Sequence, residues 1–186
     1  MRIVGGSLGG RVLRAPGGAA TRPTSEKVRE AVFAVLGSAG ATIEGGHVLD
    51  LFAGSGALGL EALSRGAAHA TFVDAGKPAL IAIRGNLREL GVDDRATVIG
   101  GDAIVVAKRA VTTPYDLVFV DPPYASDLAT RAVAALPPES LSPHAVIVIE
   151  HDRRNAPPDA IGSLLRTDHR RYGDTYVSFY EVPTKA

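Results

Sequence analysis

From residue 46 onward, short apolar runs alternate with segments of helical periodicity, and this alternation limits the fold more than any other feature of the chain. The apolar runs cover residues 47–52, 69–74, 96–102, 115–121 and 145–150, and the helical segments cover 57–66, 78–91, 103–110 and 128–136. The run 117–120 is apolar at every position, which is typical of a strand covered on both faces. The pattern predicts an α/β fold with a mostly parallel, doubly wound sheet and right-handed crossovers.

The two ends of the chain depart from this alternation. Residues 2–15 read as two short strands around a glycine-rich turn, and a helix with apolar positions at 28, 31, 32, 35 and 36 begins near Thr24 or Ser25. Residues 163–173 and 175–182 read as a C-terminal hairpin with a tight Gly-Asp turn, which completes a sheet edge with antiparallel strands. We therefore expect an N-terminal extension over 1–40 and one domain over 41–186.

Composition excludes several classes of site. The chain has no cysteine, so disulfides, thiolate zinc sites and cysteine nucleophiles are ruled out, and its five histidines lack metal-ligand spacing, so we expect no metal. No apolar run approaches the ~20 residues that span a membrane, and the N-terminus lacks the apolar region of a signal peptide, so we expect a cytoplasmic protein. The formal net charge is zero, but residues 1–31 carry six cations and two acids, whereas 32–149 carry eight cations and twelve acids. This asymmetry indicates either a basic arm or a merely solvated N-terminus.

The stretch "LDLFAGSGALGLEA" places Gly54-x-Gly56-x-x-Gly59 between the first strand and its helix. Glycines there permit a tight turn and a close approach of the backbone to a nucleotide or nucleoside, although the motif is also compatible with a structural turn. Asp74, 20 residues after Gly54, can accept both hydroxyls of a ribose. Asp102 can accept from an adenine amine while the Ala103 N–H faces a ring nitrogen. Both aspartates could instead cap the helices that follow them.

These features fit two classes of ligand, dinucleotides and S-adenosylmethionine. A dinucleotide needs its pyrophosphate met by the helix N-terminus, whereas S-adenosylmethionine carries an amino acid end with an ammonium group. Asp50, just ahead of the glycine loop, can pair with that ammonium and is less suited to a pyrophosphate. The sequence therefore favours the methyl donor.

The fourth strand runs directly into Asp121-Pro122-Pro123-Tyr124. In a doubly wound sheet this strand lies beside the first, so Asp121 is expected to face the glycine loop. The lone pair of a nucleobase amine is conjugated into the ring, and two acceptors that hold its hydrogens, the Asp121 carboxylate and the Pro122 carbonyl, redirect that lone pair toward a methyl group. The two prolines keep these oxygens in position, and Tyr124 can stack on the base. The structural alternative is a turn that precedes a helix.

At these residues the chain resembles the RsmD-type bacterial 16S rRNA guanine-N2 methyltransferases. The resemblance rests on "MRIVGGSLGGRVLRAP", "RPTSEKVREAVFAVL", "DLFAGSGALGLEALSRGA" and "VFVDPPY". It implies a class I methyltransferase fold, S-adenosylmethionine as donor, and the exocyclic amine of one guanine in the 30S subunit or a late assembly intermediate as acceptor. Because the chain forms one domain, we expect it to work as a monomer. Carried over by position, the resemblance implies that the donor lies along Asp50, Phe52, Ala53, Gly54, Gly56, Asp74, Asp102 and Ala103, and the guanine at Asp121, Pro122, Pro123 and Tyr124.

An enzyme that acts on folded RNA needs phosphate contacts that position it. We expect these phosphate contacts from the basic N-terminal arm and from the loop after the fifth strand, and His151 adds to the same face. The candidate residues are Arg11, Arg14, Arg22, Thr24, Lys27, Arg29, Arg153 and Arg154. Three other functions stay open on the sequence: adenine-N6 methylation of DNA or RNA, a nicotinamide-dependent dehydrogenase, and a non-catalytic RNA-binding assembly factor.

Overall fold

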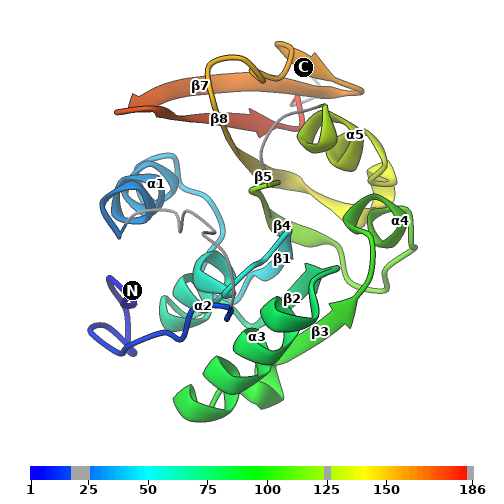
Figure 1. The fold of residues 1–186 in the computed structure, drawn as a ribbon. Helices are drawn as coiled ribbons and strands as arrows, with labels where there is room; N and C mark the ends of the chain where they lie inside the picture. The colour runs from blue at the N-terminus through cyan, green and yellow to red at the C-terminus, as the bar shows by residue number, and fades with distance from the viewer. Residues whose placement is uncertain (18–25, 124–126, 184–186) are drawn as a thin grey trace.

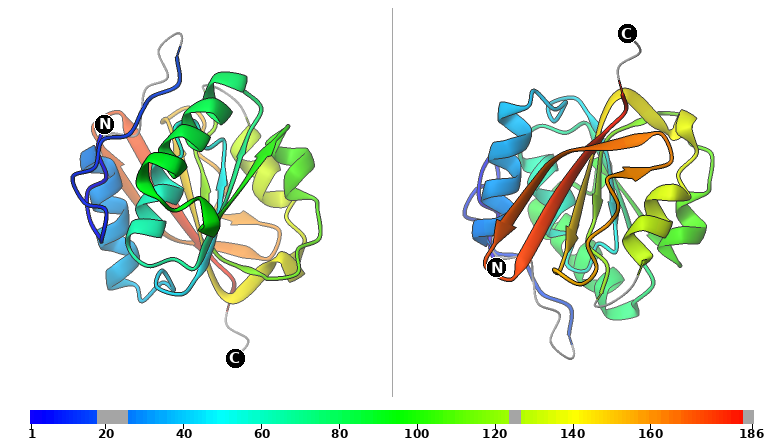
Figure 2. Two further views of the ribbon diagram at one scale, coloured as in Figure 1. Left: turned by 90° about the horizontal axis from the view of Figure 1, so that it is seen from below. Right: turned by 90° about the horizontal axis from the view of Figure 1, so that it is seen from above.

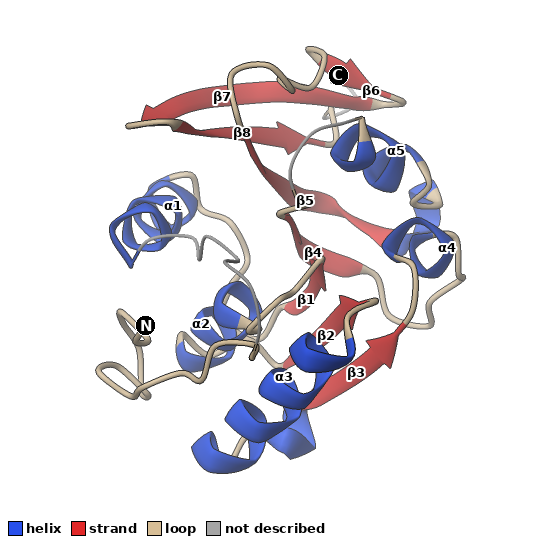
Figure 3. Ribbon diagram, viewed as in Figure 1, coloured by secondary structure: helices blue, strands red, loops and turns tan. Residues whose placement is uncertain are grey.

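The computed structural model describes residues 1–17, 26–123 and 127–183, which form an eight-stranded mixed sheet with helices on both faces (Figures 1 and 3). The helices are α1 (Glu26–Ser38), α2 (Ala57–Ser64), α3 (Lys77–Leu90), α4 (Ala103–Ala107) and α5 (Leu128–Ala134), with 3₁₀ turns η1 (Asp93–Arg95) and η2 (Pro138–Ser140). The strands are β1 (His47–Leu51), β2 (His69–Asp74), β3 (Ala96–Gly100), β4 (Tyr115–Val120), β5 (Leu141–His151), β6 (Ala160–Ile161), β7 (Leu164–Tyr172) and β8 (Thr175–Glu181).

The sheet order is β3-β2-β1-β4-β5-β8-β7-β6. The first five strands in this order are parallel, and β1 lies between β2 and β4, so the strand order reverses at β1 and β4. A reversal of this kind opens a ligand crevice at the carboxyl ends of the strands. The order confirms the predicted Rossmann-like sheet.

The C-terminal hairpin is also confirmed, because β8 pairs antiparallel with β5 and β7 pairs antiparallel with β8. Tyr172 and Thr175 pair across its two-residue turn, where Gly173 has φ 64°. A left-handed residue suits the twist of a tight hairpin, and glycine adopts it without strain. The sequence did not predict the short strand β6, which extends the edge beyond β7.

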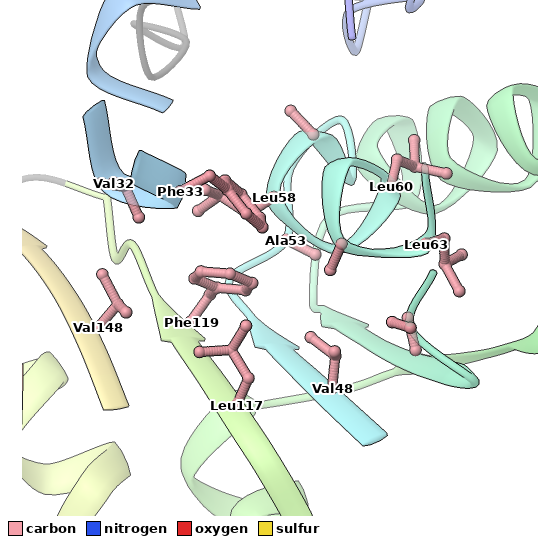
Figure 4. Close-up of a cluster of buried hydrophobic side chains, with 14 of the residues drawn as sticks. Val32, Phe33, Val48, Ala53, Leu58, Leu60, Leu63, Leu117, Phe119 and Val148 are labelled. Atoms are coloured by element: carbon pink, nitrogen blue, oxygen red, sulfur yellow. The ribbon is translucent and has the colours of Figure 1, made fainter. Parts of the chain in front are cut away.

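Side chains that alternate along the central strands divide the core into two layers. In β4, Leu117 and Phe119 pack with α1, α2 and α3, whereas Val118 and Val120 pack with α4 and α5. Figure 4 shows Phe119 beside Phe33 of α1, and their ring centroids are 5.6 Å apart. Because both faces are buried, the central strands read as continuous apolar runs.

The N-terminal segment lies on the same side of the sheet as α1, away from α4 and α5 (Figure 2). Its expected two strands are reduced to one isolated antiparallel bridge, Arg2 to Val12. The two arms still pair, because the Ile3 N–H donates to the Arg11 carbonyl and the Leu13 N–H donates to the Met1 carbonyl. The segment also binds α2: the Val4 and Gly5 N–H groups donate to the Glu61 carboxylate, and the Ser7 N–H donates to the Ser64 carbonyl.

One further boundary differs from expectation, and one lies outside the described residues. Strand β5 begins at Leu141 rather than at residue 145, although Pro143 lacks an N–H, because Leu141 pairs with Tyr115 ahead of an irregularity in the β4–β5 register. The expected helix caps Thr24 and Ser25 lie outside the described residues. Within the described parts of the chain, no helix is long and apolar enough to cross a membrane.

Candidate functional site

The predicted glycine loop follows β1 at the carboxyl edge of the sheet. Leu51, the last residue of β1, pairs with Val73 of β2 and Val120 of β4, so these three strands end level with one another. Asp74 and Asp121 follow Val73 and Val120 directly. The topology therefore brings the glycine loop, Asp74 and Asp121 to one place, although they are far apart in the sequence.

The backbone of the glycine loop turns through three left-handed residues. Phe52, Gly54 and Gly56 have φ values of 60°, 57° and 79°, and Phe52 is the one non-glycine residue with positive φ in the described chain. An aromatic residue held in this conformation stores strain, which is typical of functional loops. The Ala53 N–H donates to the Val73 carbonyl at 3.0 Å and fixes the loop to β2.

The three glycines of the motif serve different purposes. A Cβ added at Gly54 would meet only the Phe52 carbonyl oxygen, at 4.0 Å, so a ligand can approach this backbone closely. A Cβ at Gly56 would lie 3.3 Å from the Phe72 ring, and a Cβ at Gly59 only 2.4 Å from it. Gly59 is therefore required for close packing of α2 on β2, and Gly54 is the position that faces open space.

Asp50 lies beneath the loop, with 2% of its surface exposed. Its Oδ2 accepts the Gly59 N–H at 3.0 Å. Burial raises the pKa of Asp50 well above its usual value, and the carboxylates of Asp121 and Asp74 add to the increase. The three acids thus lie near one another at the glycine loop, and the raised pKa favours the neutral form of Asp50 until a cationic ligand is bound.

Asp74 fastens the glycine loop to the start of α3. Its Oδ2 accepts the Gly54 N–H at 2.8 Å, and its Oδ1 accepts the Gly76 N–H at 2.7 Å. Each carboxylate oxygen retains a second lone pair, so the partly exposed side chain can still accept from a ligand hydroxyl.

Asp102 lies near Asp74, because the neighbouring Gly101 N–H donates to the Asp74 carbonyl at 3.0 Å. Its Oδ1 caps α4 by accepting the N–H groups of Ile104 and Val105 at 2.8 and 3.0 Å. The capping alternative considered on the sequence therefore holds for this residue. The predicted adenine contacts of Asp102 and of the buried Ala103 stay predictions.

The Asp-Pro-Pro segment begins beside β1, where the Asp121 N–H donates to the Leu51 carbonyl at 3.4 Å. Asp121 and Pro122 are partly buried and Pro123 is exposed, so the segment reaches the surface at the carboxyl edge of the sheet. Tyr124 lies outside the described residues. Within the described chain, no three histidine or acidic side chains form a metal-binding group.

Residues 1–181 match the family described as "Conserved hypothetical protein 95". The chain belongs to this family. It is 41% identical over 187 residues to "Putative rRNA methyltransferase YlbH" of Bacillus subtilis, covering 97% of this chain and 98% of that protein. It is also 38% identical over 165 residues to "Ribosomal RNA small subunit methyltransferase D" of Escherichia coli K12, covering 85% of this chain and 78% of that protein.

The solved structure "Putative methyltransferase yhhF from Escherichia coli" superimposes with a TM-score of 0.85 at 33% identity, covering 100% of this chain and 99% of that chain. These similarities confirm the predicted resemblance to the RsmD-type methyltransferases and the methyltransferase fold.

One residue of the predicted RNA-binding set is corrected by the structure. Arg29, which we expected to be available to solvent, is 0% exposed and pairs with Glu61 at 3.2 Å. Helical spacing explains the error, because Arg29 lies three, four and seven positions before Val32, Phe33 and Leu36, on the buried face of α1. Arg29 is therefore structural.

The other predicted cations of the arm and the β5 loop are exposed where they are described: Arg11, Arg14, Lys27, Arg153 and Arg154. Arg14 pairs with Glu89 at 2.9 Å and Arg11 donates to the Glu89 carbonyl at 2.9 Å, so both lie along α3. Arg22 and Thr24 lie outside the described residues. His151, which was expected to add to the same face as Arg153 and Arg154, is buried and is therefore not a surface cation.

Two side chains that were not predicted from the sequence join the arm to the site. Glu61 of α2 is fully buried and accepts from the Val4 and Gly5 N–H groups and from both Arg29 and Arg65. Asn86 of α3 accepts the Arg14 N–H at 2.8 Å and donates to the carbonyl of Ser55, inside the glycine loop, at 3.0 Å. The signal available for Glu61 was a lone acid within the apolar helix "ALGLEALS"; Asn86 gave none.

Proposed function

We propose that this protein transfers a methyl group from S-adenosylmethionine to the exocyclic N2 amine of a guanine in 16S rRNA. The observation that carries the proposal is that Asp50, Asp74 and Asp121 lie at the ends of three neighbouring strands, where Asp74 accepts the N–H of Gly54, whose backbone faces open space. Members of the same family are named rRNA methyltransferases. We further propose that the acceptor lies in the 30S subunit or a late assembly intermediate and that the protein acts as a monomer.

The acids at the loop distinguish between the two classes of ligand. A pyrophosphate would meet Asp74 and Asp121 and would further disfavour ionisation of Asp50, whereas S-adenosylmethionine brings a sulfonium and an ammonium that acids attract. The acids therefore support the methyl donor over a dinucleotide and speak against a nicotinamide-dependent dehydrogenase. When bound, the donor supplies an electrophilic methyl group.

We assign each donor contact to one of the residues described above. Gly54 admits the donor close to the backbone, with Phe52, Ala53 and Gly56 shaping the turn, and Asp50 provides charge for the ammonium. Asp74 accepts from the ribose, and Asp102 and Ala103 bind the adenine edge.

The acceptor is held by the oxygens at the end of β4. The Asp121 carboxylate and the Pro122 carbonyl accept the two hydrogens of the guanine amine, which points its lone pair at the methyl group. The C–N bond forms as the C–S bond breaks, the sulfur becomes a neutral thioether, and the amine loses one proton, for which the bound Asp121 carboxylate is the adjacent acceptor. Pro123 stiffens the loop and Tyr124 stacks on the base.

The RNA contacts come from two sides of this pocket. Arg11, Arg14, Arg22, Thr24 and Lys27 on the arm, and Arg153 and Arg154 after β5, position the rRNA through its phosphates. The target guanine must leave its stack to reach Asp121.

The decisive experiment gives the protein labelled S-adenosylmethionine with 30S particles that lack the modification, and with naked 16S rRNA. Nucleoside digestion should yield labelled N2-methylguanosine, and label in N6-methyladenosine would overturn the base assignment. Asp121→Ala should abolish transfer while leaving particle binding largely intact, and unchanged turnover would remove Asp121 from the mechanism. A non-catalytic assembly factor would bind particles but transfer no label.

The donor is tested separately by thermal unfolding. S-adenosylhomocysteine at about 100 times its dissociation constant should add about 2.7 kcal/mol of apparent stability. A stabilisation by NAD alone would refute the donor assignment.

A further inference from the structure

A hollow of about 460 Å³ lies outside the proposed donor and guanine contacts. It is lined by residues of the loop after β5 and of the β7–β8 turn, namely Asp152, Arg153, Arg154, Arg171, Asp174 and Tyr176. Its volume is within the range of small-ligand sites, which is about 300–1,000 Å³. Among its lining residues are three arginines and an aromatic ring.

Strand register places this hollow beside the Asp-Pro-Pro segment. Val120 of β4 pairs with Ile149 of parallel β5, and β5 continues for two residues to His151. The loop that carries Arg153 and Arg154 therefore leaves the sheet next to the segment that begins at Asp121, at a spacing of about 4.8 Å between strands. On its other side, His151 pairs with Tyr176 of β8, which pairs with Arg171 of β7.

The arginine-bearing loop is held in shape by one carboxylate oxygen. Asp152 Oδ1 accepts the N–H groups of Arg154 and Asn155, both at 2.8 Å, and the Asn155 side-chain amide at 2.9 Å. This Asx turn commits that oxygen to the backbone and fixes the loop that presents Arg153 and Arg154.

Three rings support the hollow from the sheet. His151, His169 and Tyr176 are nearly parallel, with centroids 5.5–5.9 Å apart, and the Arg171 guanidinium lies 5.7 Å from the Tyr176 centroid. Ser178 Oγ lies 2.9 Å from His151 Nε2 and 3.0 Å from His169 Nδ1.

Hydrogen-bond chemistry assigns the protons of this cluster. His151 Nδ1 lies 2.8 Å from the Asp152 carbonyl, which can only accept, so Nδ1 carries the proton. Neutral His151 then accepts the Ser178 hydroxyl at Nε2, and Ser178 accepts from His169 Nδ1. The cluster is a built platform that joins β5, β7 and β8 under the arginines.

We propose that this hollow binds backbone phosphate of a single-stranded rRNA segment next to the target guanine, with Tyr176 beneath the strand; this rests on the proposed function. Arginine forks match phosphate oxygens, and Arg153, Arg154 and Arg171 approach the hollow from two loops. Single-stranded segments are also where a base can be splayed toward Asp121. Two acids oppose the three arginines: Asp174 in the hairpin turn, and Asp152, whose Oδ1 is held by the loop backbone.

The test compares two matched double variants in RNA binding, which needs no turnover. Arg153→Ala/Arg154→Ala removes two cations from the hollow, and Lys108→Ala/Arg109→Ala removes two exposed cations between α4 and the start of β4. Affinity for a fluorescent single-stranded 16S rRNA oligonucleotide spanning the mapped target, or failing that a generic single-stranded RNA, is measured from 50 to 200 mM salt. In the hollow variant, the slope of log K against log salt should be shallower by about 1.4. The loss of affinity between 50 and 200 mM salt should therefore be about sevenfold smaller than in the unaltered protein, while the control variant keeps the slope of the unaltered protein.

Two single variants add a change of opposite sign. Arg171→Ala should weaken binding, and Asp174→Asn should strengthen it by a comparable factor, which loss of structure could not do. Equal salt slopes for the two double variants, or weaker binding by Asp174→Asn, would overturn the proposal. Methyl transfer by the unaltered protein is measured in parallel: absence of transfer with the slope difference intact would refute the proposed function and leave phosphate binding standing.

Discussion

Replacing Glu61 with glutamine should destabilise the fold more than any surface change. Glu61 is fully buried and is the acid partner of buried Arg29, so the variant leaves a guanidinium without its counter-charge. Losing one partner of a buried pair costs about 3–5 kcal/mol, a large share of the 5–15 kcal/mol that stabilises a typical domain. With an m value of about 2 kcal/mol/M, the midpoint of urea unfolding should fall by about 2 M.

The structure also predicts an asymmetry between the two partners. Arg29→Met leaves Glu61 paired with Arg65 at 2.9 Å and with the Val4 and Gly5 N–H groups, so its carboxylate stays compensated and the cost should be smaller. Glu89→Gln, which breaks the exposed pair with Arg14, serves as a control and should cost at most about 1 kcal/mol. An unfolding free energy for Arg29→Met equal to or below that of Glu61→Gln would refute this reasoning.

Three further changes have signs fixed by the structure. Gly59→Ala should destabilise the fold by about 1–3 kcal/mol, because its Cβ would lie 2.4 Å from Phe72. Gly85→Ala in α3 is the control: its Cβ would meet nothing within 4 Å, and the substitution should stabilise the fold by about 0.5–1 kcal/mol. Equal melting temperatures of the two variants would contradict the packing argument. Burial lowers the pKa of His151 despite the opposing Asp152 carbonyl, so the unfolded chain binds more protons below about pH 6.5 and the free energy of unfolding should fall on acidification. In urea titrations at several pH values, His151→Gln should reduce the dependence of the unfolding free energy on pH. Part of that dependence should remain, because burial also lowers the pKa of His69. Burial raises the pKa of Asp50, and a cationic donor favours its charged form, so calorimetric affinity for S-adenosylmethionine should rise with pH in the protein and not in Asp50→Asn.

Local sequence determined most of the scaffold and the position of the crevice. The apolar runs of the four strands β2, β1, β4 and β5 are buried on both faces, and burial on two faces requires apolar residues wherever the strand lies in the sheet, whereas the edge strand β3 has no buried residue. The glycine spacing predicted the turn after β1, and the run "FVDPP" predicted where β4 ends, because proline removes ladder donors and glycine permits left-handed φ at any location. These properties belong to a residue and its neighbours in the chain.

Tertiary structure alone decided which charges are buried and which are presented. Arg29 is a cation in a basic segment, and only the packing of α1 against the N-terminal segment and α2 buries it against Glu61, 32 residues away. Likewise, the hairpin sequence predicted a sheet edge, but the pairing of β8 with β5 is what brings Arg171 and Tyr176 to the loop of Arg153 and Arg154. Electrostatic partners and hollows depend on distances between segments remote in sequence, and the chain fixes those distances only when the sheet has assembled.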